Sequence, residues 1–275
     1  MGTTKTLWKA AAFAAALALA PLPAASSGAG GASAARIASA VTAHDGAPFL
    51  AGVDMRLAPG WKTYWKNPGD SGIAPVFDWS ASENLAGIDL AWPAPRRFDD
   101  PGDVTFGYAD EVVWPLRVVP ADPALPVALR LALAYGVCSA SICVPRTADL
   151  ALTVPPAAPG AAAAPSADLP RLAAALARLP QPLDDPAALT VRWREAEAPV
   201  LEIAYTGCPR PCAAPPLIVD GPDGVWFGVP EVRRAGDTLH YSVEVGALST
   251  ATLAGERLGF ILGGGEDARI GWWTP

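Results

Sequence analysis

Val127-Ala-Leu-Arg-Leu-Ala-Leu-Ala-Tyr135 carries the clearest strand pattern of the chain. Its larger side chains alternate with alanine and arginine, and this period of two is typical of a half-buried β-strand. Val112–Val119 is a second apolar segment of strand length. Turn signals rich in proline, glycine and aspartate, such as Asn67-Pro68-Gly69-Asp70, separate the segments. We therefore expect residues 36–154 to form a β-sandwich.

The composition of the 275-residue chain supports an all-β fold. It contains 30 prolines and 26 glycines, more than a helical bundle tolerates. The formal net charge is −7 and basic runs are lacking, so the chain repels phosphate backbones and we expect no nucleic-acid partner. No motif indicates a bound cofactor, and we expect none.

The N-terminus has the three-part pattern of an export signal. Lys5 and Lys9 precede the apolar run Ala10–Leu22, and small residues follow. Cleavage is expected after Ala25 or within Ala32-Ser33-Ala34, with a disordered tail through residue 35. The run is too short to span a bilayer comfortably, so we expect a periplasmic protein without stable membrane insertion.

The second half of the chain predicts a further sandwich. Pro155–Pro165 is a linker of proline, alanine and glycine, and a short helix follows with Leu169, Leu172, Leu176 and Leu179 on one face. Residues 155–186 are thus predicted as linker and helix, and residues 187–275 as a second β-sandwich. Its expected strands are Leu189–Trp193, Val200–Tyr205, Leu217–Val219, Val225–Val229, Leu239–Val245 and Leu258–Leu262.

The four cysteines form two close pairs, and the first is Cys138 with Cys143. Their odd spacing puts the sulfurs on opposite faces of one continuous strand, so they meet only if Ser139–Ile142 forms a hairpin loop. Pro145 cannot donate a ladder hydrogen bond, which favours a strand at a sheet edge.

Three interpretations of this pair stay open from spacing alone. A disulfide closing so short a loop contributes about 2 kcal/mol, which is a modest stabilising bond. A redox-active pair suits an exposed turn equally well. A metal site is disfavoured, because His44 and His240 have no paired ligand nearby.

Cys208-Pro-Arg-Pro-Cys212 is the second pair and a candidate second disulfide. Its two prolines stiffen the intervening turn, which favours a structural bond. A second exchange site and a soft-metal site such as Cu(I) remain alternatives.

Four segments together resemble a known family. They are Gly60-Trp-Lys-Thr-Tyr-Trp-Lys-Asn-Pro-Gly-Asp-Ser-Gly72, Trp92-Pro-Ala-Pro-Arg-Arg-Phe98, Gly107-Tyr108 and Tyr135-Gly-Val-Cys-Ser-Ala-Ser-Ile-Cys-Val-Pro145. The chain resembles the N-terminal periplasmic domain of the thiol:disulfide interchange protein DsbD, and especially the DsbD-like and ScsB-like copper-tolerance proteins with two β-domains.

The resemblance implies two immunoglobulin-like sandwiches and a redox-active centre at Cys138 and Cys143, with Cys143 forming mixed disulfides. Tyr64 and Trp65 lie in the signature segment and are candidates to shield the pair, although both suit a sandwich core. The implied partners are thioredoxin-like periplasmic proteins, cytochrome c maturation factors and a membrane electron-transfer protein. Because no membrane or thioredoxin-like domain is present before Pro275, we expect a separate electron donor.

Two functions from different classes remain. The first is periplasmic thiol–disulfide exchange, in which the chain acts as a protein-disulfide reductase component. The alternative is a non-enzymatic immunoglobulin-like binding or copper-tolerance module whose disulfides are structural.

Overall fold

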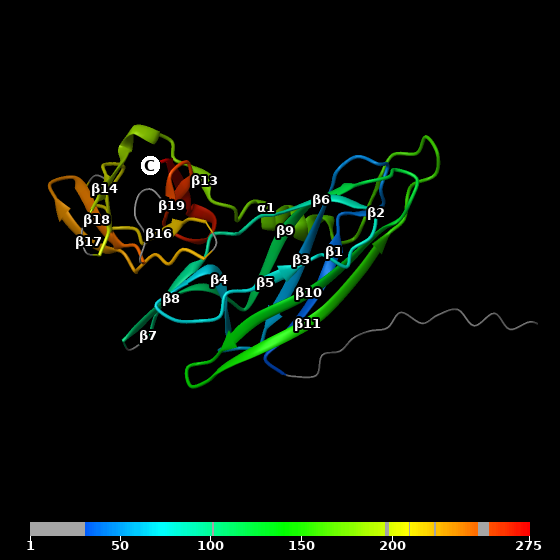
Figure 1. Ribbon diagram of the computed structural model, residues 1–275, viewed down its shortest axis with the longest axis horizontal. Coiled ribbons are helices and arrows are strands. Elements are labelled where there is room, and N and C mark those ends of the chain that lie inside the picture. Colours follow the sequence, from blue (N-terminus) through cyan, green and yellow to red (C-terminus); the bar gives the residue numbers. More distant parts are fainter. Residues whose placement is uncertain (1–30, 101, 196–197, 209, 223, 247–252) are drawn as a thin grey trace, which may run out of the picture.

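The computed structural model describes residues 31–275 apart from 101, 196–197, 209, 223 and 247–252. Strands dominate this part of the chain, and they form two β-sandwiches that lie side by side (Figure 1). The apolar run of the expected export signal lies outside the described residues. Within them, no helix has the length and apolar character needed to cross a membrane.

The first sandwich consists of two antiparallel sheets. One contains, in spatial order, β1 (Ser33–Ser39), β3 (Phe49–Leu57), β9 (Glu111–Pro120) and β6 (Leu85–Leu90). The other contains β11 (Cys143–Val154), β10 (Val127–Cys138), β4 (Lys62–Gly69), β8 (Asp103–Ala109) and β7 (Arg96–Asp100), with β5 (Val76–Asp78) also paired to β10. The predicted all-β class is confirmed.

The start of β1 differs from the expected tail through residue 35. Ser33–Ala35 pair with Met55–Leu57 of β3, so the ordered sandwich begins three residues earlier. The Ser33 hydroxyl also lies 3.0 Å from the Tyr135 hydroxyl on the opposite sheet. Ladder hydrogen bonds therefore order residues whose small side chains alone suggest a flexible tail.

Burial along β10 follows the predicted alternation. Its larger side chains are all at most 5% exposed, and they are Val127, Leu129, Leu131, Leu133 and Tyr135. Trp114 on β9 meets them from the facing sheet at 0% exposure. Phe77, Trp92 and Tyr108 pack edge-on around Trp114, with ring centroids 5.3–6.2 Å apart, an arrangement that aromatic quadrupoles favour.

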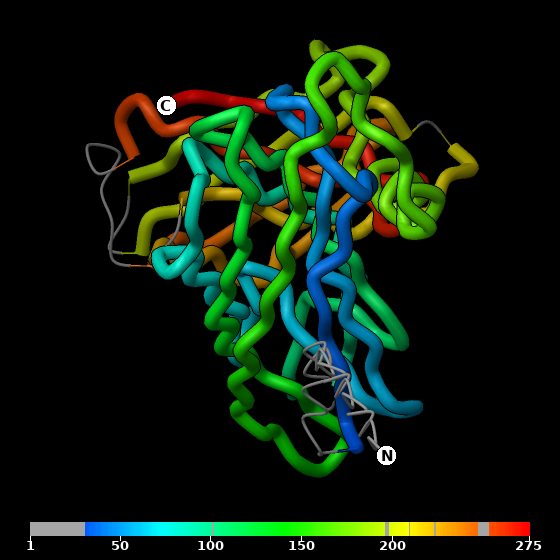
Figure 2. Tube along the Cα trace, turned by 90° about the vertical axis from the view of Figure 1, so that its right-hand side faces the viewer, coloured from blue at the N-terminus to red at the C-terminus, as the bar shows by residue number. Residues whose placement is uncertain are grey.

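β10 and β11 form a long hairpin that ends the second sheet. Their register runs without interruption from Val127 opposite Val154 to Cys138 opposite Cys143. Figure 2 shows the tip of this hairpin, in green, at the lower end of the molecule, whereas most of the second sandwich, in yellow to red, lies higher. β11 has a single neighbour, β10, in the described sheet and is thus an edge strand, as predicted from Pro145.

The segment between the sandwiches packs on the first of them. β12 (Ala164–Pro165) pairs with β2 (Val41–Ala43), and α1 (Leu169–Leu176) contacts β9, β1 and β3. Leu172 and Ala175 are the buried residues of α1, whereas Leu169 and Leu176 are 38% and 40% exposed. The predicted helix is present, and among the leucines expected on one face Leu172 is the one buried within α1. Because the helix is only eight residues long, the face that it turns to the first sheet is narrow, and Leu172 and Ala175 fill that face.

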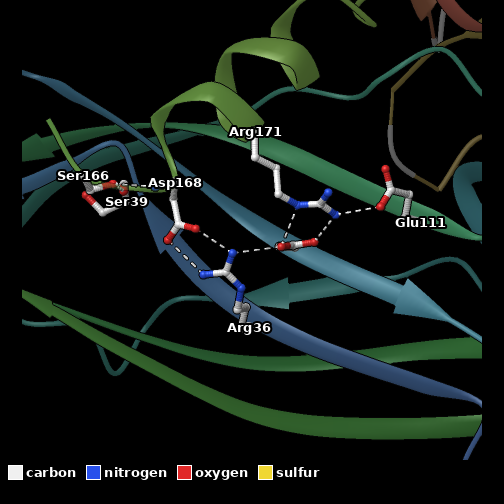
Figure 3. Close-up of polar contacts among 7 residues, drawn as sticks. Arg36, Ser39, Glu111, Ser166, Asp168 and Arg171 are labelled. Carbon is white, nitrogen blue, oxygen red and sulfur yellow. Dashed lines mark hydrogen bonds and ion pairs between the residues drawn. The ribbon is translucent and has the colours of Figure 1, made fainter.

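An ion-pair network clamps α1 to the first sheet (Figure 3). Asp54 of β3 is 3% exposed and accepts from Arg171 at 2.8 and 2.6 Å and from Arg36 at 3.1 Å. Arg36 also donates to Asp168 at 2.9 and 2.7 Å, and Arg171 donates to Glu111 at 3.0 Å. The Arg36 guanidinium lowers the pKa of Asp168, mainly through these hydrogen bonds. The clamp therefore fixes both the start of α1 and its first turn.

The second sandwich consists of two four-stranded sheets. One contains β13 (Gln181–Pro182), β20 (Arg269–Trp273), β19 (Leu258–Leu262) and β16 (Leu217–Asp220), and the other contains β14 (Leu189–Arg194), β15 (Val200–Tyr205), β18 (Thr238–Glu244) and β17 (Glu231–Ala235). Short 3-10 turns occur at Pro186–Ala188 and Gly265–Asp267. The sandwich thus begins at Gln181, inside the expected linker.

One expected strand of this half is absent from the described ladder. Val225–Val229 contributes a single bridge, Phe227 opposite Val245, and β17 takes the adjacent position in the sheet instead. Phe227 is nevertheless 1% exposed, so its apolar character reflects core packing rather than strand pairing.

The two sandwiches share part of one core. Apolar side chains of the second sandwich pack in the same buried cluster as the first, and they are Ile218, Ile261, Ala268 and Ile270. Beside them Lys66 and Asp220 form an ion pair, and the Asn67 amide donates to the Phe227 carbonyl at 3.4 Å. The boundary between independently folding units therefore remains a prediction.

Candidate functional site

The Cys138–Cys143 disulfide closes the tip of the β10–β11 hairpin. The two residues are direct register partners, with their Cα atoms 4.1 Å apart. Ser139 donates its backbone N–H to the Ile142 carbonyl at 2.9 Å, which closes the four-residue loop. The hairpin deduced from the odd spacing is confirmed, because only a reversal of the chain brings these sulfurs together.

The two cysteines differ sharply in exposure. Cys138 is 1% exposed at the end of β10, whereas Cys143 is exposed on the edge strand β11. An attacking thiolate must approach in line with the S–S bond and reach one sulfur. Of the two, Cys143 is therefore the accessible cysteine.

Tyr64 of β4 lies against the disulfide. Its hydroxyl donates to the Cys138 sulfur at 2.7 Å and lies 3.5 Å from the Cys143 sulfur. Tyr64 is 1% exposed, and burial, followed by the carboxylates of Asp103 and Asp100, raises the pKa of its phenol. The hydroxyl therefore stays protonated at physiological pH and can donate to a thiolate on Cys138.

A glycine accommodates the Tyr64 ring. Gly72 has φ +114°, and a Cβ there would lie 2.4 Å from Cε1 of Tyr64. The next residue, Ile73, accepts the N–H of Gly136 at 3.3 Å, so this turn covers both β4 and β10. A larger residue at position 72 would displace the tyrosine ring or the turn.

Lys62 is a site residue that the sequence did not single out. It is the register partner of Cys138, and its ammonium lies 5.9 Å from the centre of the Tyr64 ring. It donates to Asp100 at 2.6 Å and to Thr105 at 2.8 Å. Its position at the start of the signature segment was the available signal, but its pairing with the cysteine strand depends on the sheet.

Trp65 points away from the site. It is 0% exposed and belongs to the buried cluster of the first sandwich. Successive side chains of a strand lie on opposite faces, so Tyr64 and Trp65 take different roles. Of the two candidate shielding aromatics, the structure places Tyr64 at the sulfurs.

The structure also pairs Cys208 with Cys212 in a disulfide, in the loop after β15. Cys208 is 3% exposed and Cys212 is exposed. This pair belongs to the second sandwich, and the first pair to the opposite sandwich.

The histidines are separate from both cysteine pairs. His44 is 0% exposed, stacks on Phe49 and places Nε2 3.0 Å from the Leu125 carbonyl oxygen. His240 lies on β18. The described residues contain no cluster of three or more histidine, cysteine or acidic side chains that could hold a metal ion.

Comparisons with known proteins agree with this geometry. A family model described as "Thiol:disulfide interchange protein DsbD, N-terminal" matches residues 33–155. The solved N-terminal periplasmic domain of ScsB from Proteus mirabilis is 25% identical, with a TM-score of 0.61, over 88% of this chain and 91% of that chain.

A second solved structure is the reduced DsbD N-terminal domain of Neisseria meningitidis. It is 17% identical over 45% of this chain and 86% of that chain, with a TM-score of 0.26, which is too low to support an argument. No curated protein matches the chain. The family match covers the whole first sandwich and its disulfide hairpin, and residues 33–155 are therefore a DsbD/ScsB-like N-terminal domain.

Proposed function

We propose that the first sandwich performs thiol–disulfide exchange in the periplasm, passing electrons through the Cys138–Cys143 couple. The observation that carries the proposal is the asymmetry of the bond: Cys143 is exposed, whereas Cys138 is buried and accepts a hydrogen bond from Tyr64. The family match and the likeness to a periplasmic ScsB domain support the compartment and the reaction class.

Reduction begins with a thiolate of a reduced donor. It attacks Sγ of Cys143, a donor–Cys143 bond forms, and the Cys138–Cys143 bond breaks. Cys138 leaves as a thiolate, and this thiolate accepts a charge-assisted hydrogen bond from the Tyr64 hydroxyl. The second donor thiol then displaces Cys143, so the donor departs oxidised and two electrons remain on the couple.

Re-oxidation by a client runs the same steps in reverse. The Cys143 thiolate attacks the client disulfide, and Cys138 then attacks Cys143 and restores the intramolecular bond. The proposed donor is a membrane or thioredoxin-like protein. The proposed clients are oxidised periplasmic proteins such as disulfide isomerases and cytochrome c maturation proteins.

The reduction potential of the couple tests this proposal. Structural disulfides have potentials below about −300 mV, whereas a carrier must lie near its partners, since about 30 mV changes the equilibrium tenfold. We expect equilibration of the chain in dithiothreitol buffers to give a value above about −300 mV for Cys138–Cys143. A much lower potential, together with no exchange with thioredoxin-like proteins, would favour a structural bond.

A further inference from the structure

The second disulfide repeats the arrangement of the first. In both pairs the N-terminal cysteine is buried, at 1% for Cys138 and 3% for Cys208, and the C-terminal cysteine is exposed. In both, a side chain from a different strand donates to the buried sulfur. Tyr64 serves Cys138, and Arg234 of β17 lies 3.5 Å from the sulfur of Cys208.

Arg234 is held in place by the loop that it serves. Its guanidinium donates to the carbonyl of Cys208 at 3.0 Å and to the carbonyl of Cys212 at 2.9 Å. Arginine presents several donors in a rigid planar fork, so two carbonyl contacts fix the direction of the remaining N–H toward the sulfur. A cation in this position stabilises a thiolate on Cys208.

The exposed sulfur has a partner for its own reduced state. The carbonyl oxygen of Ala213 lies 3.1 Å from the Cys212 sulfur. After reduction, a Cys212 thiol can donate to this oxygen while the Cys208 thiolate accepts from Arg234. Each sulfur therefore has a polar group nearby after the bond opens, and the Ala213 oxygen also lies 3.4 Å from the Cys208 sulfur.

We propose that Cys208–Cys212 is a second exchange-competent disulfide, which accepts two electrons from a dithiol partner through Cys212. A partner thiolate attacks Sγ of Cys212, the Cys208–Cys212 bond breaks, and Cys208 leaves as a thiolate beside Arg234. The second partner thiol then displaces Cys212. The partner departs as a disulfide, and the pair holds two electrons and the corresponding protons.

The first test isolates this pair in the full chain. The double variant with Cys138→Ser and Cys143→Ser lacks the first couple. The result for Cys208–Cys212 therefore does not depend on whether the first pair performs exchange. The protein is equilibrated in glutathione buffers, quenched with acid, labelled with maleimide and analysed by peptide mass. We expect the pair to pass from oxidised to reduced within these buffers. A pair that stays oxidised throughout, as structural disulfides do, overturns the proposal.

The second test concerns Arg234. Arg234→Gln should require about tenfold more reductant for half reduction, which corresponds to losing one charge-assisted hydrogen bond to the thiolate, and Arg234→Lys should retain part of the effect. Arg233→Gln is the matched control, because Arg233 precedes it on β17 and faces the opposite side of the sheet.

A purely structural arginine is distinguished by thiolate absorbance near 240 nm. In the reduced protein, this absorbance should appear at higher pH in Arg234→Gln than in Arg233→Gln. Equal profiles would contradict a role in stabilising the thiolate.

The third test compares the two sulfurs. Cys208→Ser and Cys212→Ser both lose the bond, and urea unfolding of each variant checks that it remains folded. The Cys212 thiol of the first variant should react with 5,5′-dithiobis(2-nitrobenzoate) at least about tenfold faster than the buried Cys208 thiol of the second, since access controls exchange. Equal or reversed rates would contradict attack at Cys212.

Discussion

The hydroxyl of Tyr64 donates to the sulfur of Cys138 at 2.7 Å, although 74 positions separate the two residues in the chain. The contact exists because β4 and β10 are neighbours in one sheet, with Lys62 opposite Cys138 and Thr63 opposite Val137. It places a buried, protonated donor at the sulfur that leaves in the proposed exchange.

Tyr64→Phe should make the Cys138–Cys143 couple harder to reduce. The variant keeps the ring and removes the donor, so the Cys138 thiolate loses about 1–2 kcal/mol of stabilisation, and the potential falls by about 20–40 mV. Equilibration with dithiothreitol buffers measures the change. Tyr108→Phe removes another buried hydroxyl of the same sandwich, which donates to the Pro93 carbonyl, and should leave the potential unchanged.

Single-cysteine variants should differ in trapping. Cys138→Ala leaves Cys143 exposed and should accumulate a mixed disulfide with a thioredoxin-like protein whose resolving cysteine is removed. Cys143→Ala leaves a sulfur that is 1% exposed and should trap none. Non-reducing gels and intact mass detect the adduct. Each variant should lose about 2 kcal/mol of stability, because the closed loop is short. Equal trapping by both variants would refute Cys143 as the attacked sulfur.

Asp54→Asn should release the clamp on α1. Asp54 accepts from Arg36 and Arg171, so the neutral amide removes the buried charge shared by both guanidinium groups and leaves each with one carboxylate, Asp168 or Glu111. We expect the free energy of unfolding in urea to fall by about 3 kcal/mol, as for other broken buried ion pairs. Asp89→Asn is the control: its side chain is 74% exposed beside Arg117, and its loss should cost less than about 1 kcal/mol.

Limited proteolysis should cut the tip of the connecting segment, at residues 158–162. These residues are mostly exposed, whereas the flanking residues are paired through His44 and β2. The fragments should stay associated in native size-exclusion chromatography, because Ile218 and Ile261 pack in the core of the first sandwich. Separation of two folded fragments would instead indicate independent domains.

Alkaline pH should destabilise the second sandwich. Burial raises the pKa of Tyr241 to about 12, and its hydroxyl donates to the Pro215 carbonyl at 2.7 Å. Above pH 10 the unfolded tyrosine loses its proton while the folded one keeps it, so the free energy of unfolding falls from about pH 10 toward about pH 12. Urea unfolding across this range measures the slope. Tyr241→Phe should show a smaller decline, and an identical decline would assign the effect to other groups.

Local patterns in the sequence were sufficient for the strands that build the first site. The alternation from Val127 to Tyr135 specifies which face of β10 is buried, because side chains of a strand project to opposite sides with period two. The spacing of Cys138 and Cys143 likewise specifies a hairpin with a four-residue loop. Both properties depend on neighbours within a few residues.

The second sandwich shows where such patterns fail. β17 (Glu231–Ala235) carries charged residues and was not predicted, although it pairs with β18 along its whole length. Val225–Val229 is apolar but forms one bridge. β17 is an edge strand, and its outward face needs no apolar pattern. A hydrophobic pattern therefore does not reveal which segment pairs with β18.

The sequence by itself therefore determined the all-β class, the hairpin and the two cysteine pairs. The roles of Tyr64, Trp65 and Arg234 came from tertiary structure alone. Tyr64 and Trp65 are adjacent and both aromatic, and the register of β4 against β10 sends the first to the sulfurs and the second to the core. Arg234 reaches Cys208 across 26 residues of chain. Such contacts depend on how distant strands align, and that alignment minimises the free energy of the whole sheet rather than of any local segment.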